Sequence, residues 1–133
     1  MPTPRETVAR AYELLAARDL DGYLALLHPD VVITQDPALP WGGEHVGADG
    51  AATFAITLVS HIDSRVTILE LFEAGNHVVQ YGRTAGTVNA NGARFDLPET
   101  HVWTVADGLI TRAQFYIDTA AMLAALRGEP AGG

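Results

Sequence analysis

Apolar residues in the first part of the chain recur at the spacing of a helix. Thr3 and Pro4 are a typical N-cap and first-turn pair. The apolar positions that follow lie three or four residues apart and are Val8, Ala11, Tyr12 and Leu15. Asp19 predicts the cap of a second, short helix with the inward positions Leu20, Tyr23, Leu24 and Leu27. We expect His28-Pro29 to end this helix, because proline cannot continue one.

The pattern then changes to that of a strand. Residues 31–35 are mostly β-branched and predict a strand that Asp36-Pro37 should end. The segment from Ala38 to Gly50 holds proline, tryptophan and four glycines, which indicates a structured loop. Residues 51–61 return to helical spacing, with Phe54, Leu58 and Val59 as the apolar face, and predict a third helix.

The second half of the chain predicts four strands and a last helix. The strands are expected at Arg65–Glu73, His77–Thr87, Arg94–Val105 and Leu109–Ile117. The pairs Gly75-Asn76, Asn91-Gly92 and Asp107-Gly108 separate them as hairpin turns. Asp118-Thr119 can cap a helix in which Ala120, Met122, Leu123 and Leu126 pack inward.

Helices followed by a run of strands predict an α+β fold. We expect a cone-shaped, curved, mostly antiparallel sheet packed on the N-terminal helices, enclosing a pocket at its mouth. The length of 133 residues suits one domain, expected to span residues 1–127, with a disordered tail at residues 128–133.

The composition of the chain narrows the range of possible partners and cofactors. The net charge is −8, all eight basic residues are arginine, and no basic cluster is present, which argues against nucleic acid and anionic membranes as partners. The chain has no cysteine, signal-like start or long apolar run, and we expect a cytoplasmic protein. The five histidines lack metal-ligand spacing and no nucleotide fingerprint occurs, so we expect neither a metal nor a cofactor.

Several motifs resemble one family along nearly the whole chain, from Pro4 to Arg127. These motifs are Asp19-Leu-Asp-Gly22 with Leu24–Asp30, Gln35-Asp36-Pro37, His101–Ile110 and Phe115–Thr119. They are similar to the SnoaL-like and ketosteroid isomerase-like branch of the nuclear transport factor two-like superfamily. The resemblance implies a cystatin-like α+β barrel and a homodimer that pairs through the outer sheet face, with Val102, Thr104 and Tyr116 as candidate contacts. That superfamily includes both enzymes and binding proteins, so the fold leaves the function open.

Asp36 is the first candidate catalytic residue. The resemblance places it on the aspartate that serves as the general base of ketosteroid isomerases, which are themselves a standard example of such chemistry. Independently of the family, a carboxylate at a strand end among Val, Ile, Pro and Trp is partly desolvated and could move a proton between carbons. The alternative is a turn residue that caps its own loop.

His101 is the second candidate. With a one-residue gap in the Asp107-Gly108 turn, the resemblance places it on the protonated aspartate of the isomerase oxyanion hole. Strand alternation puts Glu99, His101 and Trp103 on one face, where they could line a pocket. An imidazole there could donate a hydrogen bond to an enolate or exchange a proton near neutral pH. The alternatives are a core histidine with satisfied hydrogen bonds and a histidine on the outer sheet face.

Other residues complete the candidate lining. Tyr12 lies one position from the isomerase tyrosine in the resemblance, and it could equally pack in the core. Arg83 could pair with a substrate carboxylate or with Glu99, or simply be exposed. The remaining candidates are Trp41 and His45 in the loop that could cover the mouth, together with Tyr81 and Phe115.

The sequence thus predicts a cofactor-independent acid/base enzyme of the isomerase, polyketide cyclase or dehydratase type, acting on a small and mostly apolar carbonyl compound. Asp36 would remove a proton next to the carbonyl and His101 would stabilise the enolate. Epoxide hydrolysis is disfavoured, because Ala85 and Phe115 occupy the acid positions that the resemblance assigns to it. The alternatives are a non-catalytic small-molecule-binding domain and an assembly module.

Overall fold

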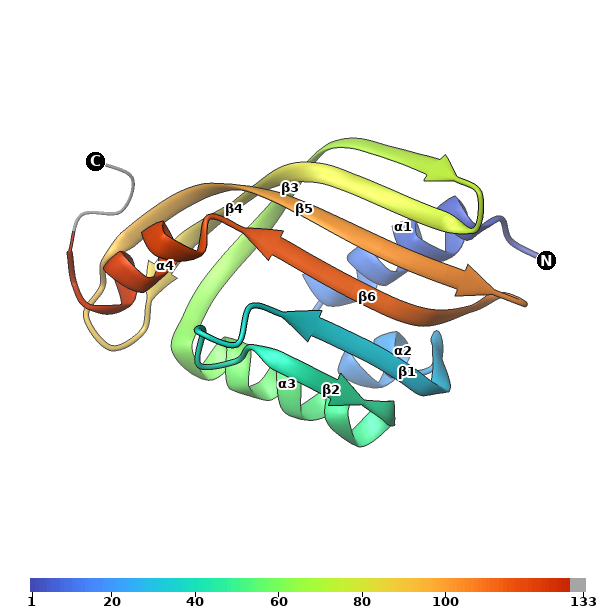
Figure 1. Cartoon of the computed structure of the whole chain (residues 1–133), viewed down its shortest axis with the longest axis horizontal. Coiled ribbons are helices and arrows are strands. Elements are labelled where there is room, and N and C mark those ends of the chain that lie inside the picture. The colour runs from blue at the N-terminus through green and yellow to red at the C-terminus, as the bar shows by residue number, and fades with distance from the viewer. Residues whose placement is uncertain (130–133) are drawn as a thin grey trace.

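A computed structural model describes residues 1–129. This part of the chain contains six strands and four helices (Figure 1). In chain order they are α1 (Pro4–Ala16), α2 (Leu20–Leu24), β1 (Leu27–Gln35), β2 (Gly43–Val46), α3 (Gly47–His61), β3 (Ile62–Ala74), β4 (His77–Val88), β5 (Arg94–Ala106), β6 (Leu109–Ile117) and α4 (Thr119–Leu126).

All six strands form one curved sheet in the order β2-β1-β6-β5-β4-β3. The strands pair antiparallel except for β1 and β6, which run parallel. In Figure 1 helix α1 lies behind the sheet, α3 runs beside β1 and β2, and α4 lies at the end of the sheet next to β5. This is the expected α+β architecture of a curved, mostly antiparallel sheet packed on N-terminal helices.

Three of the four helices, α1, α2 and α4, begin at the residues that the sequence predicts. Thr3 and Glu6 form a reciprocal capping box at the start of α1. The carboxylates of Asp19 and Asp118 accept backbone N–H bonds at the starts of α2 and α4, at 2.9 and 3.1 Å. These contacts satisfy amide groups that the first turn of a helix otherwise leaves unpaired.

Two of the three hairpin turns have the predicted length. Asp107 and Gly108 both adopt positive φ, 51° and 78°, as a two-residue turn of the type common in hairpins requires. Gly75 has φ of 66° and joins β3 to β4 directly. The β4–β5 connection is longer than the Asn91-Gly92 pair, because Thr87 pairs with Arg94.

The structure corrects four element boundaries. Helix α2 ends at Leu24, and His28-Pro29 lies within β1 rather than ending a helix. The proline is tolerated because the β1–β6 pairing is irregular between Leu27 and Val32. The expected loop from Ala38 to Gly50 contains β2 and the first turn of α3. Strand β3 begins at Ile62, directly after α3, rather than at Arg65.

The core lies between the helices and the concave face of the sheet. On β5 the odd-numbered residues from Phe95 to Val105 are buried and the even-numbered ones are not, as strand alternation requires. On α1 the buried leucine is Leu14, whereas the predicted Leu15 is only partly buried. Side chains of the sheet that point inward and could take part in a reaction therefore lie on the concave face.

After α4 the backbone continues into a turn. The Gly128 and Glu129 amides donate to the carbonyl groups of Ala125 and Ala124, at 2.9 and 2.8 Å. The remaining residues of the predicted tail, 130–133, lie outside the described residues. Within residues 1–129 no helix has the length and hydropathy needed to cross a membrane.

Candidate active site

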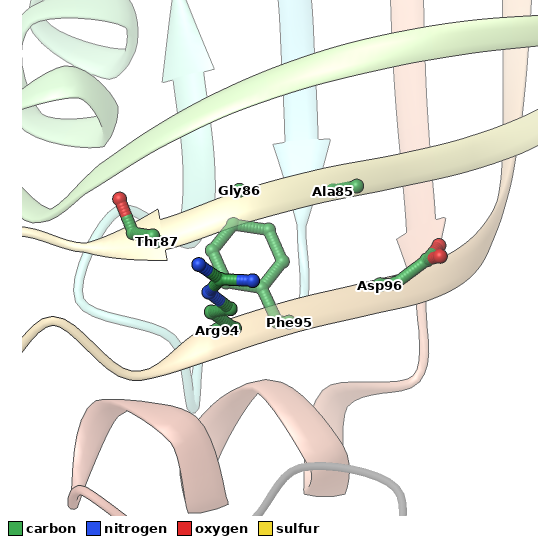
Figure 2. Close-up of a pocket in the computed structure, with 6 residues that line it drawn as sticks. All are labelled: Ala85, Gly86, Thr87, Arg94, Phe95 and Asp96. Atoms are coloured by element: carbon green, nitrogen blue, oxygen red, sulfur yellow. The ribbon is translucent and has the colours of Figure 1, made fainter.

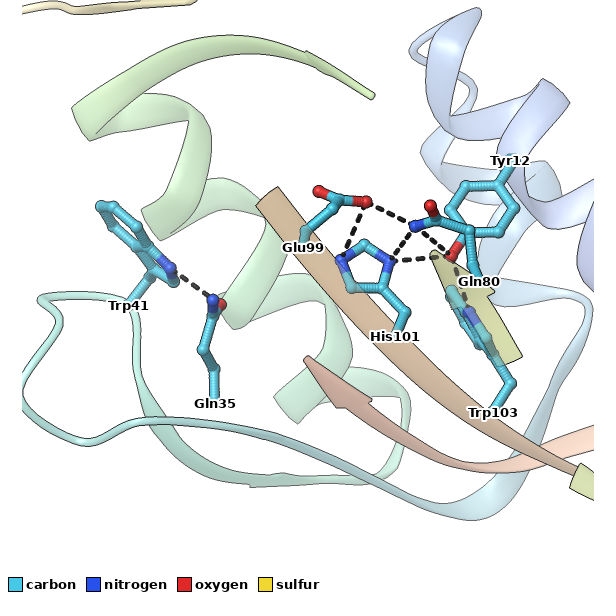
Figure 3. A network of polar contacts seen from close by, with 7 residues as sticks. All are labelled: Tyr12, Gln35, Trp41, Gln80, Glu99, His101 and Trp103. Carbon is cyan, nitrogen blue, oxygen red and sulfur yellow. Dashed lines mark hydrogen bonds and ion pairs between the residues drawn. The ribbon is translucent and has the colours of Figure 1, made fainter. Parts of the chain in front are cut away.

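Five polar and aromatic side chains meet on the concave face (Figure 3). We call them the Glu99 cluster; they are Tyr12 from α1, Gln80 from β4, and Glu99, His101 and Trp103 from β5. The three β5 residues alternate along the strand, as the sequence predicts, and Gln80 is paired with His101 across the β4–β5 ladder. All five are buried.

The contacts within the cluster set the direction of its hydrogen bonds. Trp103 Nε1 donates to Tyr12 Oη at 2.8 Å. Tyr12 Oη also accepts from Gln80 Nε2 at 3.3 Å, so both of its lone pairs are used and its hydroxyl proton is donated to His101 Nδ1 at 2.7 Å. The proton of the neutral His101 ring is therefore on Nε2, which lies 3.3 Å from Glu99 Oε2.

Glu99 is a buried acid whose contacts within the cluster are to uncharged groups. It is 3% exposed and accepts a hydrogen bond at Oε2 from Gln80 Nε2. Burial raises the pKa of Glu99 to about 7, and the Gln80 hydrogen bond acts against this rise. Glu99 can therefore take up and release a proton near neutral pH.

His101 and the tyrosines of this region stay uncharged. Burial lowers the pKa of His101 to about 3, so the imidazole is neutral at pH 7. Burial also raises the pKa of Tyr12 and of Tyr23, so both phenols keep their protons. Glu99 is thus the one member of the cluster that titrates near neutrality.

An aromatic wall continues from the cluster toward β2 and α3. The ring of Phe115 lies 4.6 Å from that of His101 and 5.4 Å from that of Trp103, centre to centre. Phe54 lies 5.4 Å from Phe115 and 5.3 Å from His45. Flat apolar surfaces next to one carboxyl group suit an unsaturated or ring-shaped ligand.

Trp41 folds into the interior from the loop after β1. It is 1% exposed, and its Nε1 donates to Gln35 Oε1 at 2.9 Å. Its ring lies 5.9 Å from that of His61, and His45 Nε2 contacts the Trp41 carbonyl oxygen at 3.1 Å. Trp41 therefore packs into the core from the loop, whereas His45, which was expected in the same loop, lies in β2.

Asp36 does not join His101. Its side chain is exposed, and Oδ1 accepts the Ala38 N–H at 2.9 Å, which closes a turn at the end of β1. No hydrogen bond or ion pair between described residues links it to the Glu99 cluster. The structure corrects the expected Asp36–His101 pair, because the acid beside His101 is Glu99.

Two further predicted lining residues, Tyr81 and Arg83, lie on the opposite face of the sheet. They occupy odd positions of β4, where Tyr81 is 44% exposed, while the even positions point inward. Arg83 pairs with Asp96 at 2.7 Å, and not with Glu99 as one expectation held. Neither side chain can line the concave site, because alternation along β4 points both outward.

Two surface hollows lie away from the cluster. An open depression of about 580 Å³ lies along β4 and β5 and is lined by Ala85, Gly86, Thr87, Arg94, Phe95 and Asp96 (Figure 2). A smaller groove of about 170 Å³ lies between α1, α2 and α3. Neither hollow includes a residue of the Glu99 cluster, so neither gives direct access to Glu99.

Gln80 is the member of the cluster that sequence reasoning missed. An isolated glutamine in a strand carries no motif, and only the β4–β5 register shows that it faces His101. Among residues 1–129 no group of three or more His, Cys, Asp or Glu side chains could hold a metal ion. With a carboxyl group whose pKa is raised to about 7, the Glu99 cluster can offer proton transfer.

Comparisons with known proteins agree with this architecture. The SnoaL-like domain family model matches residues 8–113. A comparison with curated protein sequences found no match.

Solved structures resemble the chain over nearly its full length. An NTF2-like protein of unknown function from Burkholderia pseudomallei K96243 is 32% identical, with a TM-score of 0.88 and coverage of 95% of this chain and 98% of that one. TerC, crystallised with polyporic acid, is 27% identical, with a TM-score of 0.86 and coverage of 94% and 99%.

A third structure shows the same fold at lower identity. This SnoaL-like protein from Jannaschia sp. CCS1, proposed to be a polyketide cyclase, is 21% identical, with a TM-score of 0.84 and coverage of 96% and 93%. The family model spans most of the chain, and the curved sheet and the relatives agree with it. The chain therefore belongs to the SnoaL-like domain family and has the NTF2-like fold.

Proposed function

We propose that the chain is an acid/base enzyme of the isomerase, cyclase or dehydratase type, acting on a small and mostly apolar carbonyl compound without a cofactor. Membership of the SnoaL-like family favours isomerase or cyclase chemistry in general. The observation that carries the proposal is Glu99, a buried carboxyl group beside an aromatic wall whose pKa is raised to about 7.

In the proposed reaction Glu99 Oε1 takes a proton from the carbon next to the substrate carbonyl. The electron pair of the broken C–H bond forms the enolate double bond, and the negative charge moves to the carbonyl oxygen. The same carboxyl group then returns the proton at another carbon, which completes an isomerisation without net gain or loss of atoms. The neutral His101 stays beside Glu99, with its Nε2 3.3 Å from Glu99 Oε2.

The ligand of TerC gives this proposal a chemical precedent in one relative, which was crystallised with polyporic acid. A ring compound of that general kind could pack against the aromatic wall formed by Phe115 and Phe54, whose rings are stacked on each other. We extend only the class of an oxygenated ring compound to this chain.

A second candidate function is a binding domain without catalysis. It is favoured by the closed packing of the cluster, since Glu99 is 3% exposed and neither surface hollow includes a cluster residue. In that case the cluster would serve to hold α1 against β4 and β5.

We also propose that two copies pair through the outer sheet face. An apolar band crosses this face from Phe72 through Val79 to Val102, and Tyr116 is 53% exposed next to it. A second copy would cover these side chains and leave both concave faces free.

The test compares wild type with Glu99→Gln and Asp36→Asn on a panel of cyclic enones, β-keto polyketide mimics and steroids. We expect Glu99→Gln to lose about a hundredfold or more of kcat while still binding the ligand, because general-base catalysis contributes on that order. Asp36→Asn should keep turnover, since Asp36 serves a turn.

Three results would count against this assignment. Full turnover by Glu99→Gln would remove Glu99 from the reaction. Loss of turnover in Asp36→Asn alone would show that Asp36, in the loop after β1, is the general base. Ligand binding without turnover in wild type would leave the binding-domain function.

A further inference from the structure

Gln80 has hydrogen bonds that a purely structural amide does not explain. It is 0% exposed, and its Nε2 donates to Glu99 Oε2 and to Tyr12 Oη, the latter at 3.3 Å. Its Oε1 is fully buried and has no partner among the described residues. The amide is therefore oriented so that its N–H groups donate hydrogen bonds, and Gln80 Oε1 is left without a donor as a consequence.

The orientation of this amide follows from its neighbours. The hydroxyl proton of Tyr12 is donated to His101, so Tyr12 Oη can accept from Gln80 but has no proton left to give it. Turning the amide by 180° would set its oxygen against an ionised Glu99 carboxylate. Gly82 leaves room for the observed orientation, because a Cβ at that position would lie 2.3 Å from Gln80 Oε1.

The two oxygens of Glu99 are thereby made different. Oε2 accepts the Gln80 N–H and lies 3.3 Å from His101 Nε2. Oε1 accepts no hydrogen bond from the described residues, is not among the fully enclosed unpaired atoms, and points toward the side where Trp41 and Gln35 lie (Figure 3). Oε1 is therefore the oxygen of Glu99 that is free to accept a proton.

We propose that Gln80 is a positioning residue for Glu99: its amide donates to Oε2, favours the ionised form of the buried carboxyl group, and leaves Oε1 as the oxygen that exchanges a proton with substrate. The functional half of this proposal rests on the acid/base role of Glu99. The titratable groups that face Glu99 are Tyr12 from α1 and His101 from β5, both uncharged at neutral pH, and its β6 neighbour Ile117 is apolar. Gln80 is accordingly the group that opposes the effect of burial on Glu99.

The experiment follows the Glu99 carboxyl carbon by NMR through a pH titration of the ligand-free protein. Wild type is compared with Gln80→Met, which keeps the length of the side chain and removes the donor, and with Gln35→Met, which removes the other amide of the concave face. We expect the Glu99 midpoint to rise by about one pH unit in Gln80→Met, because the charged form loses its hydrogen bond. In Gln35→Met the Glu99 midpoint should stay at the wild-type value. The pH midpoint of the acid limb of kcat/KM should likewise rise in Gln80→Met and stay unchanged in Gln35→Met.

A second measurement needs no substitution at Gln80. In wild type labelled with nitrogen-15 in glutamine side chains, the Gln80 amide signal should move with the same midpoint as Glu99, and in Glu99→Gln this movement should vanish. An unchanged Glu99 midpoint in folded Gln80→Met, or a Gln80 signal that ignores the Glu99 titration, would overturn the proposal. Both titrations are read without substrate, so a failure here is separate from a failure to find turnover.

Discussion

At the scale of single residues, Glu99 makes the stability of the protein depend on pH. Burial raises its pKa from 4.5 to about 7, so the unfolded chain releases this proton at a lower pH than the folded protein does. Between those two values the folded state binds more protons, and the free energy of unfolding must fall as the pH rises. The acid is therefore best tolerated when protonated.

Replacing Glu99 by Gln should reverse this penalty. Relative to wild type, Glu99→Gln should gain about 2 kcal/mol in free energy of unfolding between pH 5 and pH 8, because the amide carries no charge to bury. Urea unfolding of both proteins at the two pH values measures the difference. His101 opposes folding below its unfolded pKa in both proteins, so its effect cancels in this comparison. A difference that does not change with pH would show that Glu99 is already ionised or fully solvated at pH 5.

Single residues also show what the sequence could and could not predict. Alternation along β5 correctly places Glu99, His101 and Trp103 on one face, because side-chain direction in a strand depends on local geometry alone. The choice between Asp36 and Glu99 as the acid beside His101 depends instead on how β1 ends and how deeply each side chain is buried. Tyr81 and Arg83 were misplaced for a similar reason, since no residue on β4 marks which of its faces turns inward.

At the scale of elements, the hairpins determine which side chains meet. A two-residue turn at Asn91-Gly92 would pair Gln80 with Trp103, whereas the longer observed connection pairs it with His101. The shift of two residues keeps Gln80 and its partner on the same face of the sheet, so strand alternation alone does not distinguish the two registers. The parallel β1–β6 pair and the short strand β2 join distant segments, and no local pattern indicates them.

The β3–β4 hairpin depends on a close backbone approach at Gly86. A Cβ at this position would lie 1.9 Å from the Asp63 carbonyl oxygen, and the paired backbone has little freedom to move away. Gly86→Ala should therefore lower the free energy of unfolding by about 2 kcal/mol or more, measured by urea denaturation.

Gly92→Ala, in the neighbouring β4–β5 connection, is the control for this variant. Open space surrounds Gly92, and only its φ of 73° opposes a side chain, so the loss should be about 1 kcal/mol. Equal losses in the two variants would mean that the β3–β4 ladder opens to accommodate the methyl group.

At the scale of the whole molecule, charge and burial divide the two faces of the sheet. The concave face holds Glu99 without a basic partner, while the ion pairs formed by arginine join exposed or half-exposed side chains. The convex face instead exposes an apolar band. This division supports a substrate site on one face and a second copy on the other.

Val102 belongs to the apolar band on the convex face and provides the test of pairing. In Val102→Glu a charge would have to be buried between the two copies, so sedimentation equilibrium should show a shift from dimer to monomer. Ile56→Glu is the control, because Ile56 is 59% exposed on α3 and lies off the convex face. A wild-type protein that sediments as a monomer, or a Val102→Glu variant that remains a dimer, would contradict pairing through this band.

The two tryptophans of the chain give the site a built-in optical signal. Trp103 donates its indole N–H into the Glu99 cluster, and Trp41 comes from the loop that packs over the same concave face. Both indoles are shielded from water. The tryptophan fluorescence of the unlabelled protein therefore arises from rings at this face. Its wavelength and intensity follow the contact of these rings with solvent, with the neighbouring carboxyl group and with any ring compound that enters.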